Sequence, residues 1–328
     1  MLVDLRSDTM TRPTPEMRRA MADAEVGNDA YAEDPTVNAL QEEFAARVGK
    51  EAALYVPSGT MANQIALRIL ARPGSLVLAH RTSHIVAFEN GAGAYNTGAQ
   101  ILGADDLGEI RYAIAAAAHH QPTPSMVCLE NTHMAGSGSV LPVETVVDVA
   151  AVGLPVHLDG ARLWNASVAT GIPMAAWSAP ATTVMCCLSK GLCAPVGSLL
   201  AGAADVIEQA RVQRHRLGGG MCQAGVIAAA GLVALRTMVD RLAEDHRRAG
   251  QVAEAIQARW PKADIPDPQT NIVTVALEDA EEFVAHLAAA GVLAGTIAPG
   301  VVRFVTHHDV DDAGVEQARM AIASYAGR

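Results

Sequence analysis

The lysines of this chain are its first candidates for covalent chemistry. Only three of its 24 basic residues are lysines, Lys50, Lys190 and Lys262. Lys190 follows an apolar segment and has small or apolar neighbours over residues 188–192. Burial there would lower the pKa of the amine and make it a better nucleophile. Lys50 lies between a glycine and a glutamate and Lys262 beside a proline, so we expect both at the surface.

Asp159 is the second candidate. It ends an apolar segment and precedes Lys190 by 31 residues. A buried carboxylate is tolerated only where a cation or several hydrogen-bond donors compensate it. Two partners fit: Arg162, three residues later, in a purely structural ion pair, or the protonated ring nitrogen of a bound ligand.

A small-residue turn at Ser58, Gly59 and Thr60 separates a predicted strand at 53–56 from a predicted helix at 61–70. Two hydroxyl groups, a close backbone approach and the free N–H groups of a helix start suit a phosphate. Neither GxxxxGK[ST] nor a strand-bound GxGxxG is present. A phosphate site, a buried aspartate and a lysine, in that order, are what pyridoxal phosphate requires. The aspartate keeps its ring nitrogen protonated and the lysine forms a Schiff base.

Two histidines follow predicted strands and could lie near such a ligand. His84 comes shortly after the strand at 75–79, and His133 ends the run Glu130 to His133. Each could equally be a structural histidine of the core. His307 and His308 adjoin Asp309, but no cysteine or carboxylate at ligand spacing accompanies them, so we expect no metal site.

The pattern of predicted elements indicates how these residues are brought together. Helix-like and strand-like segments alternate from about residue 35 to about residue 235, which is typical of a mostly parallel sheet wrapped by helices. Asp34 should begin a helix over 35–48 that Gly49 ends. Further strands are predicted at 75–79, 125–129, 155–158 and 183–188. Ligands of such sheets bind beyond the carboxyl ends of the strands, where the polar tails should converge.

The remaining segments predict a smaller second domain. Helices are expected at 224–235 and 237–259, followed by prolines. Strands near 271–277 and 301–306 and helices near 280–290 and 312–325 have the make-up of a small α+β domain. We therefore divide the chain into a large ligand-binding domain with an N-terminal arm, 1–240, and a small C-terminal domain, 241–328.

Composition excludes several classes of function. The formal net charge is −11 and no basic stripe is present, which disfavours nucleic acid and anionic membranes as partners. Half of the residues are hydrophobic, yet no apolar run reaches the length of a membrane span. Charges in the first fifteen residues disfavour a signal peptide, so we expect a cytoplasmic protein. Five cysteines without metal-ligand spacing favour reduced thiols, and we expect Cys186 and Cys187 to pack in the core.

Ordered motifs over almost the whole chain resemble one family, the low-specificity L-threonine aldolases of the fold-type I pyridoxal phosphate enzymes. The matching segments are 3–9, 27–35, 58–63, 83–85, 130–133, 157–162, 188–198, 218–221 and 303–307. The resemblance implies the fold of that class, with a mostly parallel seven-stranded sheet. It also implies a homotetramer, as a dimer of dimers, and cleavage of L-threonine, L-allo-threonine and other β-hydroxy-α-amino acids to glycine and an aldehyde, reversibly.

The same resemblance implies roles for individual residues. Lys190 holds the cofactor aldehyde, Asp159 pairs with the ring nitrogen, and His84 stacks on the ring. The turn at 58–60 holds the phosphate, through Gly59 and Thr60 with Ser58 beside them. Ser7, Arg162 and Arg303 bind the substrate carboxylate, which places Arg162 in the cofactor cavity too, and His133 lies near the substrate hydroxyl. His84, His133 and a bound water remain open as the hydroxyl base.

The sequence departs from the family pattern at His215, Cys222 and Cys193, where a lysine, an arginine and a glycine are usual. Three alternatives to threonine cleavage remain. One is pyridoxal phosphate-dependent β-elimination or racemisation, another is an aldolase of the phenylserine type, and the last is a homologue that has lost catalysis.

Overall fold

The computed structural model describes residues 2–327. Its largest feature is a seven-stranded sheet in the order β2-β8-β7-β6-β5-β3-β4, in which β8 runs antiparallel to its neighbours and the other strands are parallel to one another. The expected mostly parallel sheet is confirmed. Its strands are β2 (Ala52–Val56), β3 (Leu76–Ala79), β4 (Gln100–Gly103), β5 (Pro124–Glu130), β6 (Val156–Asp159), β7 (Thr183–Cys187) and β8 (Ser198–Gly202).

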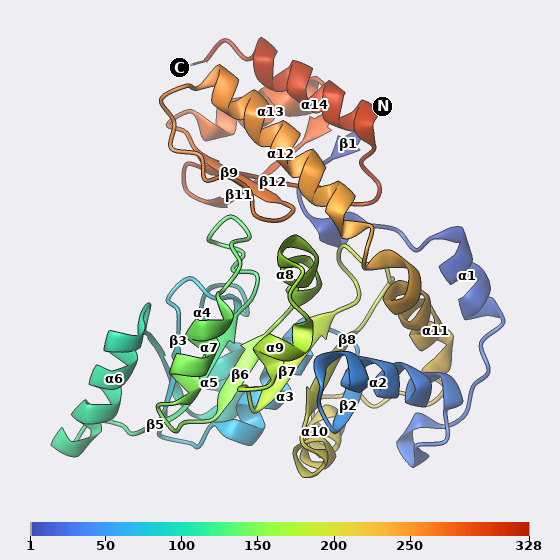
Figure 1. Ribbon diagram of the computed structural model, residues 1–328, viewed down its shortest axis with the longest axis vertical. Helices are drawn as coiled ribbons and strands as arrows, with labels where there is room; N and C mark the ends of the chain where they lie inside the picture. Colours follow the sequence, from blue (N-terminus) through green and yellow to red (C-terminus); the bar gives the residue numbers. More distant parts are fainter. Residues whose placement is uncertain (1, 328) are drawn as a thin grey trace.

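Helices cover both faces of this sheet (Figure 1). They are α1 (Pro15–Ala22), α2 (Pro35–Val48), α3 (Gly59–Leu70), α4 (His84–Ala87), α5 (Ala92–Thr97), α6 (Leu107–Ala116), α7 (Val143–Ala150), α8 (Leu163–Thr170), α9 (Met174–Ser178), α10 (Ala204–Arg216) and α11 (Gly225–Val233). Alternate residues of β7 show the two layers. Val184 and Cys186 pack with the core under α2, α8 and α9, whereas Met185 and Cys187 pack with α3 and α10. The two adjacent cysteines therefore belong to the core, as predicted.

Helix α2 has the two ends that its sequence predicts. Asp34 accepts hydrogen bonds from the backbone N–H groups of Thr36 and Val37, at 3.1 and 3.0 Å. Gly49 ends the helix in the left-handed conformation, with φ +64°. The second carboxylate oxygen of Asp34 accepts from the backbone of Gly225, at 2.8 Å. The cap therefore also fixes the start of α11.

A smaller unit stands above the large sheet in Figure 1. Its elements are α12 (Leu242–Arg259), β9 (Ile272–Ala276), α13 (Ala280–Ala289), β10 (Val292–Leu293), β11 (Gly295–Ala298), β12 (Val301–Val305) and α14 (Asp312–Ser324). The strands β11, β12 and β9 form an antiparallel sheet. The N-terminal strand β1 (Val3–Asp4) pairs in parallel with β10, and Val3 and Leu5 are buried in the small core. The N-terminal arm is the segment before α1, residues 2–14. On sequence we grouped it with the large domain, but it begins in the small unit.

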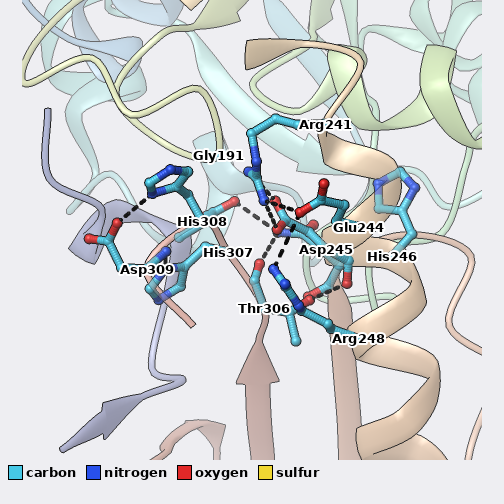
Figure 2. Close-up of polar contacts among 12 residues, drawn as sticks. Gly191, Arg241, Glu244, Asp245, His246, Arg248, Thr306, His307, His308 and Asp309 are labelled. Atoms are coloured by element: carbon cyan, nitrogen blue, oxygen red, sulfur yellow. Dashed lines mark hydrogen bonds and ion pairs between the residues drawn. The ribbon is translucent and has the colours of Figure 1, made fainter. Parts of the chain in front are cut away.

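A group of polar contacts holds the start of α12 within the small unit (Figure 2). Arg241 and Asp245 form a two-point ion pair with distances of 2.6 and 3.1 Å. The hydroxyl of Thr306 donates to the carbonyl of Asp245 at 2.6 Å. Beyond Thr306, the Asp309 carboxylate accepts from the backbone N–H of Arg12 at 3.0 Å. The arm is therefore held at both of its ends by the small unit.

Within the large sheet, two strands were not predicted from the sequence, and one helix begins later than predicted. β4 is a partly exposed strand of four residues and β8 is a short Ser-Leu-Leu-Ala-Gly run, so neither carries a strong apolar signal. The helix expected from residue 237 begins at Leu242, because the chain first passes through a wider helical turn at 234–238. Among residues 2–327, no helix is long and apolar enough to cross a membrane.

We predict that Asp34→Ala lowers the free energy of unfolding by about 2–4 kcal/mol, because it removes a helix cap and leaves buried backbone donors unpaired. Asp106→Ala is the matched control. Asp106 caps α6 through one exposed contact, to the backbone of Glu109 at 2.8 Å, and its loss should cost about 1 kcal/mol. Urea unfolding of both variants measures the difference. Equal losses would show that the contact with α11 adds nothing.

Candidate active site

A cavity of about 110 Å³ lies beyond the carboxyl ends of β5, β6 and β7. Six residues expected at the site line it, namely Gly59, Thr60, His84, Asp159, Arg162 and Lys190. Asn63, Glu130, Thr132, Met134, Ala161, Met185, Cys187 and Ser189 complete the lining. The predicted convergence of the strand tails is therefore confirmed.

Asp159 is 3% exposed and lies at the end of β6. Its carboxylate accepts hydrogen bonds from the side chain of Asn63, at 2.7 Å, and from the backbone N–H of Ala161, at 3.1 Å. The structural pair with Arg162 is not formed. Arg162 instead binds both carboxylate oxygens of Asp8, at 2.6 and 2.7 Å. Among residues 2–327, Asp159 has no salt-bridge partner, which suits a cationic group of a ligand.

The ion pair between Arg162 and Asp8 is fully desolvated. Burial would raise the pKa of Asp8, but the charge and hydrogen bonds of Arg162 outweigh it and hold that pKa well below its usual range. Asn271 donates a further hydrogen bond to Asp8 at 3.2 Å. The arm also contacts the backbone of Lys190, since the Thr11 hydroxyl donates to the carbonyl of Lys190 at 2.8 Å. Arg162 is therefore positioned by the arm.

The turn at 58–60 forms a cradle at the start of α3. Ser58 caps the helix by accepting from the backbone of Met61 at 3.1 Å, so its hydroxyl is used inside the protein. Gly59 has no room for a side chain, because a Cβ atom there would lie 2.7 Å from the Cys187 sulfur. The buried Ser198 hydroxyl has no hydrogen-bond partner in the described part of the chain and would lie 3.6 Å from that Cβ. Free helix N–H groups and this unpaired hydroxyl suit an anion.

His84 lines the cavity and is paired with a buried carboxylate. Its Nδ1 lies 2.8 Å from Oε1 of Glu89. Burial would lower the pKa of His84, but the hydrogen bond to Glu89 and the charges of Asp159 and Glu89 outweigh it, so that the pKa is raised. His84 is therefore a stronger base than an ordinary imidazole.

The structure does not bring His133 into this cavity. Its Nε2 lies 3.0 Å from the hydroxyl of Thr82, and its ring packs edge-on against His80 with centroids 4.6 Å apart. It lines a neighbouring apolar cavity of about 300 Å³. Burial, and then the charge of His80, lower its pKa.

Of the three residues expected to bind the substrate carboxylate, Arg162 and Arg303 lie close together, whereas Ser7 does not line the cavity. Arg303 donates to the carbonyl of Arg6 at 2.8 Å and contacts the sulfur of Met134, which lines the cavity. Burial and the charge of Arg162 lower the pKa of Arg303, so the two guanidinium groups lie close enough to repel. An anion between them would relieve that repulsion. Ser7 does not line the cavity, and its hydroxyl accepts from the backbone of Thr9 at 3.2 Å.

Glu130 was not singled out as a site residue on sequence. It nevertheless links the segment that begins at His84 to the loop that carries His133 and Met134. Its carboxylate accepts from the backbone N–H groups of His84, at 2.6 Å, and Met134, at 2.8 Å. Burial and the charge of Asp159, its neighbour across β5 and β6, raise the pKa of Glu130 to about 7. Asn63, Glu89 and Asp8 were missed as well. Asn63 had a usable signal, since it lies one turn into the helix that follows the cradle and lines the cavity.

The three departures from the family pattern lie outside the cavity. Cys193 is buried with φ +65°, the left-handed region, which explains why glycine is usual at that position. His215 and Cys222 line a separate cavity of about 280 Å³. Arg214 does not replace a missing cation there, because it pairs with Asp29 at 2.6 Å and with the carbonyl of Tyr55.

Comparison with known proteins shows the family of the chain. The sequence model of the beta-eliminating lyase family matches residues 4–280. The chain belongs to this family. A low-specificity L-threonine aldolase of Arabidopsis thaliana is 40% identical over 95% of this chain and 93% of its own length. The low specificity L-threonine aldolase of Escherichia coli K12 is 41% identical over 94% of this chain and 95% of its own. The solved threonine aldolase of Leishmania major has the same fold, with a TM-score of 0.85 at 19% identity and 98% of each chain covered.

We predict that Glu130→Gln changes how stability depends on pH. A folded-state pKa of about 7, above the unfolded value of about 4.3, gives stability that is present below pH 4.3 and is lost as the pH rises through 7. Relative to the parent, Glu130→Gln should therefore gain about 1–3 kcal/mol between pH 5 and pH 7.5 in urea unfolding.

Glu144→Gln, at an exposed position of α7, is the control. Its curve of stability against pH should run parallel to that of the parent. A Glu130→Gln curve that also runs parallel would show that Glu130 is ionised throughout.

Proposed function

We propose that this protein is a pyridoxal phosphate-dependent aldolase that cleaves L-threonine, L-allo-threonine and other β-hydroxy-α-amino acids to glycine and an aldehyde. The observation that carries the proposal is one cavity that contains Lys190, the helix start at Gly59 and the buried carboxylate of Asp159, which has no salt-bridge partner among residues 2–327. The relatives that are 40% and 41% identical over nearly the full chain are named as aldolases of this kind.

The residues present fit the cofactor. Gly59 and Thr60 would hold its phosphate with the N–H groups of α3, and Ser58 would keep the helix start in place. Asp159 would bind the protonated ring nitrogen, Lys190 the aldehyde carbon, and His84 would lie against the ring. When bound, pyridoxal phosphate supplies an acceptor for the electron pair released at the α-carbon of the amino acid.

The chain itself orients the substrate and moves its protons. Arg162, held by Asp8, and Arg303 provide two charged donors for the α-carboxylate. Fixing that carboxylate fixes which bond of the α-carbon is broken. A base of the protein takes the proton of the β-hydroxyl group, the Cα–Cβ bond breaks, and the aldehyde leaves. Protonation of the α-carbon then gives glycine.

We also propose the homotetramer and the cytoplasmic location that the sequence led us to expect. Both proposals rest on the resemblance of the sequence to the threonine aldolases. Light scattering of the purified protein measures the assembly.

Product analysis tests the function. With L-threonine, the cofactor-loaded protein should release glycine and acetaldehyde in equal amounts, and Lys190→Ala should release neither. Borohydride should attach the cofactor to a peptide containing Lys190 in the parent and not in the variant. Formation of 2-oxobutyrate and ammonia instead would show β-elimination, the reaction that the family is named for. A reaction only with β-phenylserine would indicate the phenylserine type.

We predict that Arg303→Ala chiefly raises the KM for L-threonine, by about 10-fold or more, because a charge-assisted contact with the carboxylate is worth about 1.5–3 kcal/mol. Arg319→Ala is the control, since Arg319 lies on α14 and pairs with Glu316 at the surface. Steady-state kinetics measures both. An unchanged KM in Arg303→Ala would remove Arg303 from the substrate site.

A further inference from the structure

We infer that Glu89 is the positioning residue of His84, and that it turns Nε2 of this histidine towards the substrate to take the proton of the β-hydroxyl group. The inference rests on the proposed aldolase function and deepens it, because the sequence left His84, His133 and a water open as the base.

The contacts of Glu89 determine which ring nitrogen of His84 carries a hydrogen. The Glu89 side chain is fully buried, and Oε1 lies 2.8 Å from Nδ1 of His84. A carboxylate can only accept hydrogen bonds, so Nδ1 must donate. In the neutral imidazole the lone pair then belongs to Nε2. The ring lines the cavity that contains Lys190, so this lone pair is available there.

Glu89 is itself held by side chains of α3. Asn63 donates to Oε1 at 2.8 Å and Gln64 donates to Oε2 at 2.6 Å. The same amide nitrogen of Asn63 donates to Asp159 at 2.7 Å. One side chain therefore fixes both the carboxylate of the ring-nitrogen site and the carboxylate that orients His84. Such convergence is expected of a preorganised site rather than of a solvent-exposed pair.

The alternative histidine is less suited to the task. His133 lies outside the cavity, and its Nε2 already contacts the Thr82 hydroxyl. Its pKa is lowered by burial, whereas that of His84 is raised. Four charged groups interact with His84. They are Glu89 before α5, Glu130 on β5, Asp159 at the end of β6 and Lys190 after β7. Three of these four are acids, which favour proton uptake by the ring.

The proton transfer balances without a further reactant. The O–H bond of the substrate breaks and an N–H bond forms at Nε2 of His84. The released electron pair becomes the second bond of the aldehyde carbonyl as the Cα–Cβ bond breaks. The electron pair of the Cα–Cβ bond remains with the glycine fragment until the α-carbon is protonated. One proton is lost from the hydroxyl and one is gained at the α-carbon, so His84 becomes neutral again by passing its proton back, directly or through solvent, to the glycine fragment.

The pH dependence of threonine cleavage by the holoenzyme tests the pairing. Glu89→Gln keeps an oxygen that can accept from Nδ1 but removes the charge. We expect the acid limb of kcat/KM to move to lower pH by about one unit, because a neutral partner no longer raises the pKa of His84. The value of kcat should fall about 10- to 100-fold, because the base is weaker and less well held.

Two controls separate this result from a general loss of structure. Glu316→Gln, an exposed change on α14, should reproduce the parent profile. His133→Asn should leave the acid limb at the parent position, whatever its effect on rate. An unmoved limb in Glu89→Gln, combined with a limb that moves or disappears in His133→Asn, would assign the proton to His133 and overturn the inference.

A neutron crystal structure of the holoenzyme gives a readout that does not depend on activity. Deuterium on Nδ1 of His84, directed at Glu89, is expected, and a neutral ring with deuterium on Nε2 alone would contradict it. The two levels of the proposal fail separately. If the parent forms no glycine from L-threonine, the aldolase proposal fails while the neutron map still decides the pairing. If glycine forms and the limb does not move in Glu89→Gln, only the role of Glu89 is lost.

Discussion

Desolvation of negative charge is the constraint on which this site depends. Asp8, Glu89, Glu130 and Asp159 are all withdrawn from water around one cavity. Each would be strongly unfavourable without donors. Arg162 neutralises Asp8, whereas Glu89 accepts from three side-chain donors and Glu130 from two backbone N–H groups. The contacts of Glu130 tie two loops to β5, and those of Glu89 tie its loop to α3 and α4. Asp159 accepts hydrogen bonds from Asn63 and from the backbone of Ala161 but has no salt-bridge partner among residues 2–327, so a ligand with a protonated nitrogen would balance its charge.

The small unit takes part in the site through the N-terminal arm. β1 is fixed by β10, and Asp309 and Asn271 hold the arm further along, at Arg12 and Asp8. Between these points the arm supplies the partner of Arg162 and a hydrogen bond to the backbone of Lys190. The relative position of the two units therefore sets the positions of Arg162 and Lys190 together.

The sequence predicted those features that neighbouring residues determine, namely helix ends and the polar residues at the ends of strands. Asp34 and Gly49 marked the ends of α2, and apolar strands with polar tails placed Asp159 and Lys190 at one edge of the sheet. The contacts that fix those residues were not predictable in this way. Asp8 meets Arg162 across 154 positions and Asn63 meets Asp159 across 96, and no periodicity extends over such distances. His133 follows β5 as expected, but its ring turns to His80, which only the tertiary fold determines.

The pairing of β1 with β10 also orders events during synthesis. A chain leaves the ribosome from its N-terminus, and large-sheet strands from β2 to β8 are complete by residue 202, long before Val292 and Leu293 emerge. Until then the arm has no strand to pair with, and Asp8 has no fixed place beside Arg162. The large sheet can thus form early, whereas the Asp8–Arg162 pair is fixed only when almost the entire chain has been translated. Nascent or C-terminally truncated chains would accordingly present a folded sheet in which Arg162 is not yet held by the arm.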